Sequence, residues 1–343
     1  MSDETAAPRR PPARRRSWAW SNPATRGLVY QLLMLALVAV VVGWLVHNTL
    51  ANMALRGIRS GWDFLTQTAG FDIGESLIAF ESIDPYWRAF LVGLLNTLRV
   101  ALIGIVLITL LGTALGVGRY SRNALVRGLC YGYVELFRNV PILVQLLIWY
   151  LLMVEFLPEA MAPLDWGGRV FLSKSGLSLP WLAHSAEAGW SWSIPEPGAF
   201  VLEGGVTLSP EFLSVLLGLT FYTSSFVAEV VRAGIASVPR GQTEAAHSIG
   251  LSRAKTLRLV VLPQALRVII PPLTNQYLNL TKNSSLAVVI GYPDVVSIAN
   301  TALNQTGRAV ECIAIIMAVY LSTSLGTAAL MNAYNRRVAI RER

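Results

Sequence analysis

Two long runs of this sequence contain no charged side chain, and they constrain its fold more than any other feature. Residues 28–50 and 312–335, which are 23 and 24 residues long, contain no Asp, Glu, Lys or Arg. An α-helix rises 1.5 Å per residue, so each run is long enough to cross about 30 Å of hydrocarbon. Only 14% of the whole chain is charged, whereas about a quarter of residues are charged in soluble domains. The sequence therefore predicts an integral membrane protein.

Four further apolar stretches raise the expected number of transmembrane helices to six. They cover about 89–118, 128–157, 211–233 and 265–290. Each stretch contains an ionisable residue, in order Arg99, Arg138, Glu229 and Lys282. A charged side chain at the bilayer centre costs about 2.5–3.5 kcal/mol on insertion scales, so such residues usually face a cavity or a partner. We expect an all-α polytopic membrane protein whose intramembrane charges mark functional or packing sites.

The distribution of basic residues orients these helices. Eighteen Lys and Arg fall in the segments expected on the inner side, which are 1–27, 119–127, 233–268 and 334–343. Only six fall in the outer segments, which are 51–88, 158–208 and 291–308. By the positive-inside rule both termini are cytoplasmic, and the Arg-rich and Pro-rich arm 1–27 is expected to be disordered there.

The composition excludes several classes of protein. The two cysteines, Cys130 and Cys312, lie in apolar stretches, and the three histidines form no metal-binding motif. No GxxxxGK[ST] loop is present to bind a nucleotide. We therefore expect no metal site, no catalytic residue and no ATP hydrolysis by this chain. The net charge of +8 follows mainly from the inner-side bias, so no nucleic-acid partner is expected.

The outer segment 158–208 is polar and rich in tryptophan. It contains Trp166, Trp181, Trp190 and Trp192 together with many Gly, Pro and Ser residues. Tryptophan is enriched at membrane–water interfaces because its ring is apolar and its N–H is polar. We expect an ordered outer loop that lies on the membrane or against a partner.

The inner loop between the fourth and fifth spans predicts a helix, a turn and a second helix. Residues 243–249 suit a helix of about two turns, and Gly250 suits the left-handed residue that ends it. Ser252 is placed to cap a second helix, which we expect to stop near Pro263.

A helix this short is marginal alone in water, so another surface must hold it. Ala245, Ala246 and Ile249 would give it a small apolar face, with Arg240 and Glu244 at the rim. Such a face favours docking into a groove of another protein. The alternative is an amphipathic inner loop that lies on the membrane.

This loop resembles the EAA loop of ABC-importer permeases. The matching pattern is Glu244-Ala245-Ala246, three residues, Gly250, nine residues and Val260-x-Leu262-Pro263, with Val260 where the family usually has Ile. Other segments are similar to the polar amino-acid uptake branch, namely Tyr222-x6-Glu229-x2-Arg232-x-Gly234-Ile235, Val238-Pro239-x-Gly241-Gln242, Leu262-Pro263-Gln264-Ala265, Lys282-x-Ser284-Ser285-Leu286 and Phe137-Arg138-Asn139-Val140-Pro141-Ile142-Leu143-Val144-Gln145. The resemblance covers 89–157 and 209–335. The first span and the long outer loops resemble the larger permeases of general L-amino-acid transport systems, the AapQ/BztB type.

The resemblance implies a type I ABC-importer permease core at 89–335, with a periplasmic insert at 158–208 and a cytoplasmic coupling loop at 236–263. Outside this core it implies a cytoplasmic arm at 1–27, an extra transmembrane helix at 28–50, a periplasmic segment at 51–88 and a basic tail at 336–343. It implies that the loop docks on an ATPase through Arg240, Gly241, Gln242, Glu244, Ala245, Ala246, Gly250, Leu262 and Pro263.

The implied function is translocation of L-amino acids across the bacterial inner membrane, without catalysis by this chain. The implied partners are a dimer of ATP-binding subunits, a second and different permease chain, and a periplasmic amino-acid-binding protein. ATP and Mg²⁺ would be bound by the ATPase, and this chain would carry no cofactor.

The ionisable residues inside the spans suggest a substrate pathway. Arg138 lies deep in the third span, where Pro141 predicts a bend, and Glu135 is placed to pair with it. An amino acid carries a carboxylate and an ammonium group, which such charges complement. The expected pathway residues are Glu135, Arg138, Gln145, Asn279, Lys282, Ser284 and Ser285. The competing interpretation is helix packing.

Other charged residues near the ends of the spans are expected to be structural. We expect Glu229 and Arg232 to stabilise the start of the coupling loop, and Arg99 to pair with Glu135 or with a neighbouring helix.

Two other functions fit parts of the sequence. An ion-coupled secondary amino-acid transporter would also use intramembrane charges and Pro-broken helices, but it needs no helix for an ATPase to bind. An intramembrane hydrolase would need a nucleophile beside a base. However, His247 lies in the inner loop, whereas Ser224 and Ser225 lie in a span.

Overall fold

The computed structural model describes residues 23–55, 57, 60–185, 189–198 and 202–338. Most of the expected arm 1–27 and of the basic tail 336–343 therefore lies outside the described residues. The chain divides into two units, Met1–Ser60 and Gly61–Arg343. Each unit is described by itself.

The first unit contains one long helix, α1 (Pro23–Leu55). Its stretch Thr25–Leu55 is long and apolar enough to cross a membrane. Apolar side chains lie all around the helix, which is the pattern of a membrane span. The first predicted span is confirmed.

The second unit is mainly helical. Its α-helices are α2 (Tyr86–Gly118), α3 (Ala124–Asn139), α4 (Ile142–Leu151), α5 (Pro210–Ala236), α6 (Arg240–Ser248), α7 (Arg253–Thr256), α8 (Leu262–Asn283), α9 (Val295–Thr306) and α10 (Ala309–Val338). Four short helices join them: η1 (Asp63–Thr66) and η4 (Ser284–Ile290) are 3₁₀ helices, and η2 (Leu152–Phe156) and η3 (Leu257–Val261) are π-helices.

The predicted membrane spans are present in this unit. Four of its helical stretches are long and apolar enough to cross a membrane, namely Tyr86–Gly118, Pro210–Ala236, Arg253–Ile290 and Ala309–Arg336. With α1 they make five, and the bent pair formed by α3 with α4 and η2 makes six if it is one span. The number of spans expected from the sequence is therefore supported over the described residues.

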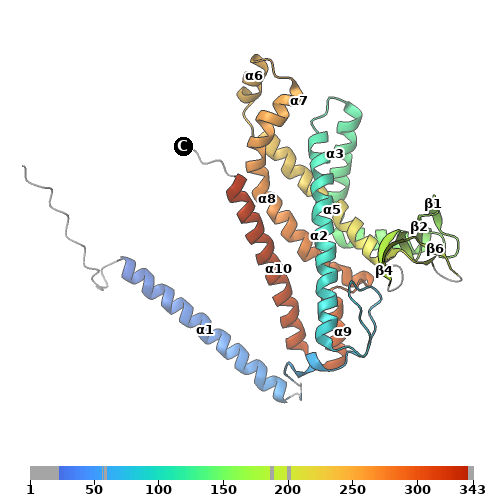
Figure 1. Cartoon of the computed structure of the whole chain (residues 1–343). Helices are drawn as coiled ribbons and strands as arrows, with labels where there is room; N and C mark the ends of the chain where they lie inside the picture. The colour runs from blue at the N-terminus through green and yellow to red at the C-terminus, as the bar shows by residue number, and fades with distance from the viewer. Residues whose placement is uncertain (1–22, 56, 58–59, 186–188, 199–201, 339–343) are drawn as a thin grey trace, which may run out of the picture. The chain divides into compact units, whose positions relative to one another are not determined.

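Helix α5 packs against α2 through glycines that let the two backbones approach. A Cβ atom on Gly112 would lie 2.5 Å from Val227, and one on Gly116 would lie 2.7 Å from Val231. Helices in membranes associate through such close contacts, because lipid provides little hydrophobic drive between them. The same core contains Ile108 and Leu219, both fully buried. This α2–α5 pair is the frame on which the rest of the unit is built (Figure 1).

The third span is broken, as Pro141 predicts. Helix α3 ends at Asn139, and the next helical segment runs at 103° to it. Pro141 precedes the first residue of α4 and has no N–H to continue the α3 ladder. The buried side chain of Gln145 satisfies the carbonyls left free at the break, because its Nε2 donates to Phe137 O and Val140 O at 2.9 Å each. A polar break at membrane depth is tolerated when its backbone groups are paired in this way.

The expected end of the second coupling helix at Pro263 is wrong. Helix α7 continues through η3 into α8, and Arg253–Ile290 forms one helical stretch. The π-turn of η3 precedes Pro263 and includes the bond from Leu262 N to Leu257 O. An i→i+5 turn shifts the hydrogen-bond register of the helix. The helix can therefore continue through Pro263, although proline has no N–H and its ring would clash with the preceding carbonyl in a regular α-helix. The loop that carries α6 and α7 is therefore continuous with a helix that is long and apolar enough to cross a membrane.

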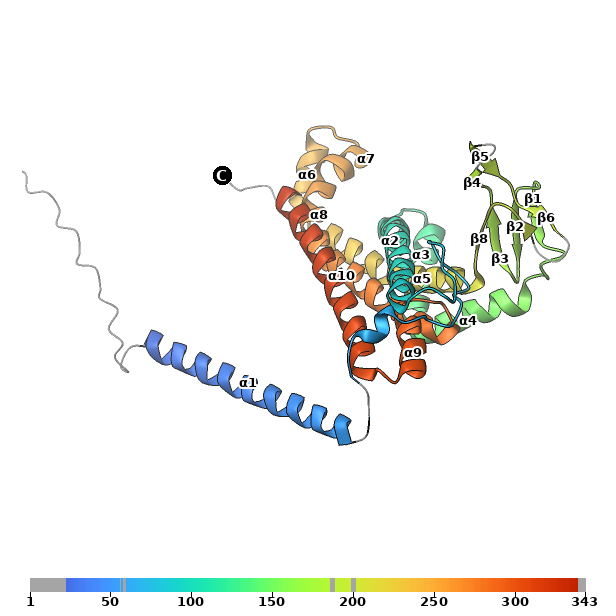
Figure 2. The same cartoon turned by 60° about the horizontal axis from the view of Figure 1, so that its bottom comes forward.

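The outer insert is folded into small sheets, which the sequence analysis described only as an ordered loop. One sheet has the order β1-β2-β3-β8 and is antiparallel throughout. Two-stranded sheets pair β4 with β5 and β6 with β7. The strands are β1 (Leu164–Trp166), β2 (Val170–Ser173), β3 (Gly176–Leu179), β4 (Trp181–Ser185), β5 (Gly189–Ser193), β6 (Glu196–Pro197), β7 (Leu202–Glu203) and β8 (Val206–Leu208). In both views they lie beside the helices, on the side of α4 and α5 and away from α10 (Figures 1 and 2).

Replacing Gly112 and Gly116 by valine should force α2 and α5 apart. Overpacking of a core typically costs about 1–3 kcal/mol for each added group, so the double variant should unfold at a markedly lower temperature in detergent. The matched control is Gly128→Ala in α3, because a Cβ there meets nothing within 4 Å. An unchanged unfolding temperature of the double valine variant would contradict the close α2–α5 packing.

Candidate functional site

The loop between α5 and α8 begins with a short helix closed by a left-handed glycine. Helix α6 ends at Ser248, and Gly250 has φ +81°, as the sequence predicts. Leu251 N donates to Ala246 O at 3.1 Å and Gly250 N donates to His247 O at 2.9 Å. These two bonds are the 6→1 and 5→2 pair of a Schellman motif, which needs a positive φ at the glycine. The turn therefore fixes how α6 leads into α7.

The outer face of α6 is small and accessible. Glu244, Ala245 and Gly241 are exposed, and Ile249 keeps 78% of its surface. Ala246, which was expected on this face, is only 4% exposed and points into the protein. Successive helical residues lie about 100° apart, so Ala245 and Ala246 cannot share one narrow face. Ala246 therefore holds the helix in place, while Ala245 and Glu244 are available for docking.

The other coupling residues lie around this helix. Arg240, Gln242 and Pro263 are exposed, and Leu262 is the first residue of α8. Ser252 occupies the N-cap position of α7, but its side chain makes no capping bond. A cavity of about 470 Å³ separates α6 and α7 from the inner ends of α2 and α5, with Val117, Tyr120 and Val238 among its lining residues. The two small helices thus project from the bundle and reach it mainly through η3 and α8 (Figure 1).

One carboxylate ties the inner ends of α2 and α5 together. Glu229 accepts a hydrogen bond from Arg119 Nη1 at 2.5 Å, and its other oxygen is bonded by Arg232. The hydroxyl of Tyr120 donates to Arg232 O at 2.8 Å. The Arg119 side chain is only 7% exposed, and its guanidinium also lies 4.5 Å from the centroid of the Tyr131 ring. This cluster stabilises the point from which the coupling loop starts, as expected for Glu229 and Arg232.

A charged cavity of about 480 Å³ opens beside this cluster. It is lined by Arg119, Tyr120, Arg127, Tyr131, Glu135, Arg138, Glu229 and Arg232. Four of its residues come from one face of α3, because positions 127, 131, 135 and 138 recur at helical spacing. The cavity therefore follows α3 from its inner end to the break in the third span. Its lining holds four arginines and two carboxylates, which favours an anionic or zwitterionic guest.

The expected pairing of Glu135 with Arg138 is wrong. The Arg138 guanidinium lies over the Phe226 ring, 5.3 Å from its centroid. The Asn139 side chain turns back at the end of α3 and donates to the main-chain oxygen of Glu135 at 2.7 Å. Both charged side chains are exposed, so each charge faces the cavity without neutralising the other.

The remaining pathway candidates lie in other places. Asn279 and Lys282 are exposed on one face of α8, whereas Ser284 is buried and donates to Thr281 O at 2.8 Å. Ser285 donates to Lys282 O at 2.8 Å, and Gln145 bridges the helix break described above. The expected pathway residues therefore fall into three groups. Some are exposed on α3, some are exposed on α8, and the others form hydrogen bonds with nearby main-chain oxygens.

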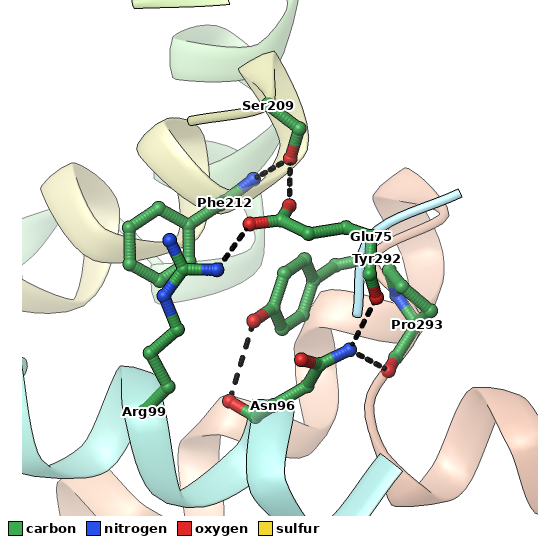
Figure 3. A network of polar contacts seen from close by, with 7 residues as sticks. All are labelled: Glu75, Asn96, Arg99, Ser209, Phe212, Tyr292 and Pro293. Atoms are coloured by element: carbon green, nitrogen blue, oxygen red, sulfur yellow. Dashed lines mark hydrogen bonds and ion pairs between the residues drawn. The ribbon is translucent and has the colours of Figure 1, made fainter. Parts of the chain in front are cut away.

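The outer end of the bundle contains a polar network that sequence reasoning missed (Figure 3). Arg99 forms an ion pair with Glu75 at 2.5 Å, and not with Glu135. Glu75 also accepts a hydrogen bond from Ser209, the N-cap of α5. The guanidinium of Arg99 lies 4.1 Å from the centroid of the Phe212 ring. A buried charge in a span needs a partner, so the acidic residues of segment 51–88 were the signal that could have identified Glu75.

The same network fixes the turn between η4 and α9. Asn96 Nδ2 donates to Glu75 O at 2.8 Å and to Pro293 O at 2.9 Å, and Tyr292 OH donates to Asn96 O at 3.3 Å. Burial raises the pKa of the Tyr292 hydroxyl. Burial also raises the pKa of Asp294 to about 7, although Ser297 N donates to its carboxylate. The outer loop, α2, α5 and α9 are therefore clamped together by buried polar contacts.

The described residues offer no evident site for a metal. Among them, no group of three or more His, Cys, Asp or Glu side chains is placed to hold an ion.

Known transport proteins are similar to this chain over most of its length. The family profile described as binding-protein-dependent transport system inner membrane component matches residues 108–340. The chain is 41% identical to the general L-amino acid transport system permease protein AapQ of Rhizobium johnstonii, with 95% of each chain covered. It is 42% identical to the putative amino-acid ABC transporter permease protein YhdX of Escherichia coli, over 95% of this chain and 98% of that protein.

One solved structure is similar in fold and sequence. It is the crystal structure of an amino acid ABC transporter with histidines, with a TM-score of 0.54 and 27% identity. The similarity covers 74% of this chain and 95% of that chain.

Replacing Glu229 by alanine should destabilise the inner end of the bundle. The change leaves the nearly buried Arg119 without its carboxylate, and removal of one partner of a buried pair costs about 3–5 kcal/mol. The matched control is Glu159→Ala, which breaks the pair with Lys174 on a carboxylate that is 75% exposed and should cost about 1 kcal/mol or less. Thermal unfolding in detergent measures both. Equal shifts for the two variants would argue against a structural role of Glu229.

Proposed function

This chain belongs to the family of binding-protein-dependent transport system inner membrane components, and we propose that it moves L-amino acids through the membrane as the permease subunit of an ATP-driven importer. The resemblance stated from the coupling-loop motif is confirmed at the level of the family. The observation that carries the proposal is the exposed α6 helix, which bears the Glu244-Ala245-Ala246 motif. The turn at Gly250 joins it to α7, which continues into a membrane span without a break. The chain is a transport permease and not an enzyme.

The coupling mechanism follows from that continuity. An ATPase subunit that binds the outer face of α6 would contact Glu244, Ala245 and Gly241, with Arg240 and Gln242 beside them. Because the Schellman turn at Gly250 sets the direction of α7, and α7 continues through η3 and Leu262-Pro263 into α8, a displacement of α6 reaches the membrane as motion of one helix. A two-state switch of this kind is biased by nucleotide on the partner. ATP hydrolysis, ATP and Mg²⁺ are thus assigned to the ATPase, with no cofactor in this chain.

A second permease chain is needed to cover the exposed face of α8. Lys282 and Asn279 are exposed within a span, and a charged residue at that depth is costly against lipid. A neighbouring permease would cover this face and enclose a water-filled path between the two chains. The two relatives at 41–42% identity carry the names of a general L-amino acid transport permease and a putative amino-acid ABC transporter permease. We propose that the partner permease is a different chain. A periplasmic amino-acid-binding protein would deliver the substrate.

The α3 cavity is the best candidate for contact with the substrate in this chain. An amino acid is a zwitterion, and the cavity offers the separate charges of Arg138 and Glu135 to its carboxylate and its ammonium group. Arg127 adds a further positive charge toward the inner end. Gln145, Ser284 and Ser285 are assigned to support of the helices that form the path, and not to contact with the substrate. Their side-chain donors already bond main-chain oxygens of the same chain.

The location follows from the same proposal. A permease of this family lies in the bacterial inner membrane, and the basic-residue bias assigns both termini to the cytoplasm. That orientation brings α6 to the side where ATP is available. The ion-coupled alternative explains the intramembrane charges but gives α6 no role, and no observation favours it.

Replacing Gly250 by valine should reduce ATP-driven amino-acid uptake while leaving the protein in the membrane. A β-branched residue at φ +81° carries a left-handed penalty of about 1–2 kcal/mol or more, so the turn between α6 and α7 should distort. Uptake of labelled amino acids by cells that express the complex at matched abundance measures the effect, and we expect a loss of at least fivefold. Gly326→Ala in α10 is the control, because a Cβ at that helical position meets nothing within 4 Å. Normal uptake by the Gly250→Val protein would contradict the coupling role of the loop.

A pull-down of the tagged chain in mild detergent should recover the ATPase and the second permease. Glu244→Lys reverses a charge on the docking face and should lose the ATPase while it retains the permease, as mass spectrometry would report. Glu135→Gln, which lies on α3 away from α6, should retain both partners. Recovery of this chain alone, with ion-driven transport after reconstitution without ATP, would support a secondary transporter instead.

A further inference from the structure

The cavity beneath α6 and α7 is basic on one side and apolar on the other. Its volume is about 470 Å³, which is the size of a small-molecule site. Helices α6 and α7 contribute Arg240, His247 and Arg253, whereas α2 and α5 contribute apolar side chains such as Val117 and Ile235. Among the described residues, no Asp or Glu lines this cavity. Its charge is therefore that of a site for an anion.

The basic side of the cavity is not the docking face of α6. Arg240, Thr243 and His247 recur at helical spacing and all line the cavity, so they share one face of the helix. Glu244 and Ala245 do not line it, and they belong to the face assigned above to the ATPase. An ATPase and a ligand in the cavity would therefore occupy different sides of α6.

Three polar groups of the cavity have no partner within the described part of the chain. Neither Arg240 nor Arg253 has a carboxylate within ion-pair distance there. Thr256 lines the same cavity and is only 3% exposed, yet its Oγ1 makes no hydrogen bond with any described residue. By contrast, Thr243 Oγ1 donates to Arg240 O at 2.6 Å. A buried hydroxyl normally finds an acceptor, and all three groups can donate to the oxygens of one anion.

We propose that this cavity binds a phosphate group, held by the guanidiniums of Arg240 and Arg253 with the Thr256 hydroxyl as a further donor. Guanidinium groups match the oxygens of phosphate as paired donors. A free amino acid fits less well, because its ammonium group meets no carboxylate in the described lining. The two arginines lie on either side of Gly250 in sequence, so the bound phosphate bridges α6 and α7.

The depth of the cavity makes two sources of phosphate available. Val117 and Ile235 are the last residues but one of α2 and α5, so the cavity lies where these two membrane-spanning helices end. Phospholipid headgroups lie at that level, and basic pockets on the inner side of membrane helices bind anionic headgroups. A headgroup phosphate and a free phosphate offer the arginines the same chemistry, but only a lipid also uses the apolar side.

Native mass spectrometry of lipid binding tests the proposal. The chain is purified in mild detergent with its partner chains and mixed with phosphatidylglycerol. A charge-assisted hydrogen bond contributes about tenfold or more in affinity, so Arg253→Gln should weaken phosphatidylglycerol binding by about that factor. The matched control is Lys255→Gln, which removes the same charge from an exposed position of α7 outside the cavity lining and should change binding by about twofold or less. The readout is binding alone and does not depend on transport.

Inorganic phosphate, added without lipid, separates the two sources. A rise of the unfolding temperature with inorganic phosphate, present in the native chain and lost in Arg253→Gln, would assign the site to free phosphate. Phosphatidylglycerol binding that depends on Arg253, without that rise, would assign it to a lipid headgroup. Equal phosphatidylglycerol binding by Arg253→Gln and Lys255→Gln, together with no Arg253-dependent response to inorganic phosphate, overturns the proposal.

Discussion

The exclusion of water from the bilayer core is the constraint on which this structure depends. A backbone or side-chain polar group at that depth must find a partner within the protein, because lipid offers none. The chain meets this requirement at several places where its helices deviate from regularity. Gln145 bonds the carbonyls at the break after Asn139, the η3 turn accommodates Pro263, and Glu75 neutralises Arg99 at the outer end of α2.

The proposed coupling depends on a continuous helix between the loop that carries α6 and the membrane span. A flexible connection would absorb any displacement of α6, whereas the chain from Arg253 to Ile290 is helical throughout. Between α6 and α8, Gly250 is the one residue whose backbone conformation requires glycine. Its φ of +81° lets the turn close with two backbone hydrogen bonds. Below α6 and α7 the cavity of about 470 Å³ leaves the two helices room to move relative to α2 and α5.

Local signals in the sequence predicted the features that depend on one residue or on one apolar run. The spans, the left-handed Gly250 and the break at Pro141 are of this kind, and so is the short helix α6. Features that depend on partners distant in sequence were missed or wrong. Glu75 meets Arg99 across 24 residues and Ser209 across 134, and β8 pairs with β3 and not with β7, its neighbour along the chain. Ala246 shows the same limit, because which side of α6 is buried depends on α7 and η3 and not on α6 itself.

The distribution of paired and unpaired charges separates structure from function in this chain. Arg99, Arg119 and Arg232 each have a carboxylate within hydrogen-bond distance. The pairs of Arg99 and Arg119 join different parts of the chain, and Arg232 pairs with Glu229 on its own helix. Glu135, Arg138 and Lys282 are exposed within membrane segments, where an uncompensated charge would be selected against if it faced lipid. Pairing within the chain would have been available to Glu135 and Arg138, which lie three residues apart on one helix face. Their separation keeps both charges open to the cavity, which agrees with the proposed path for a zwitterionic substrate.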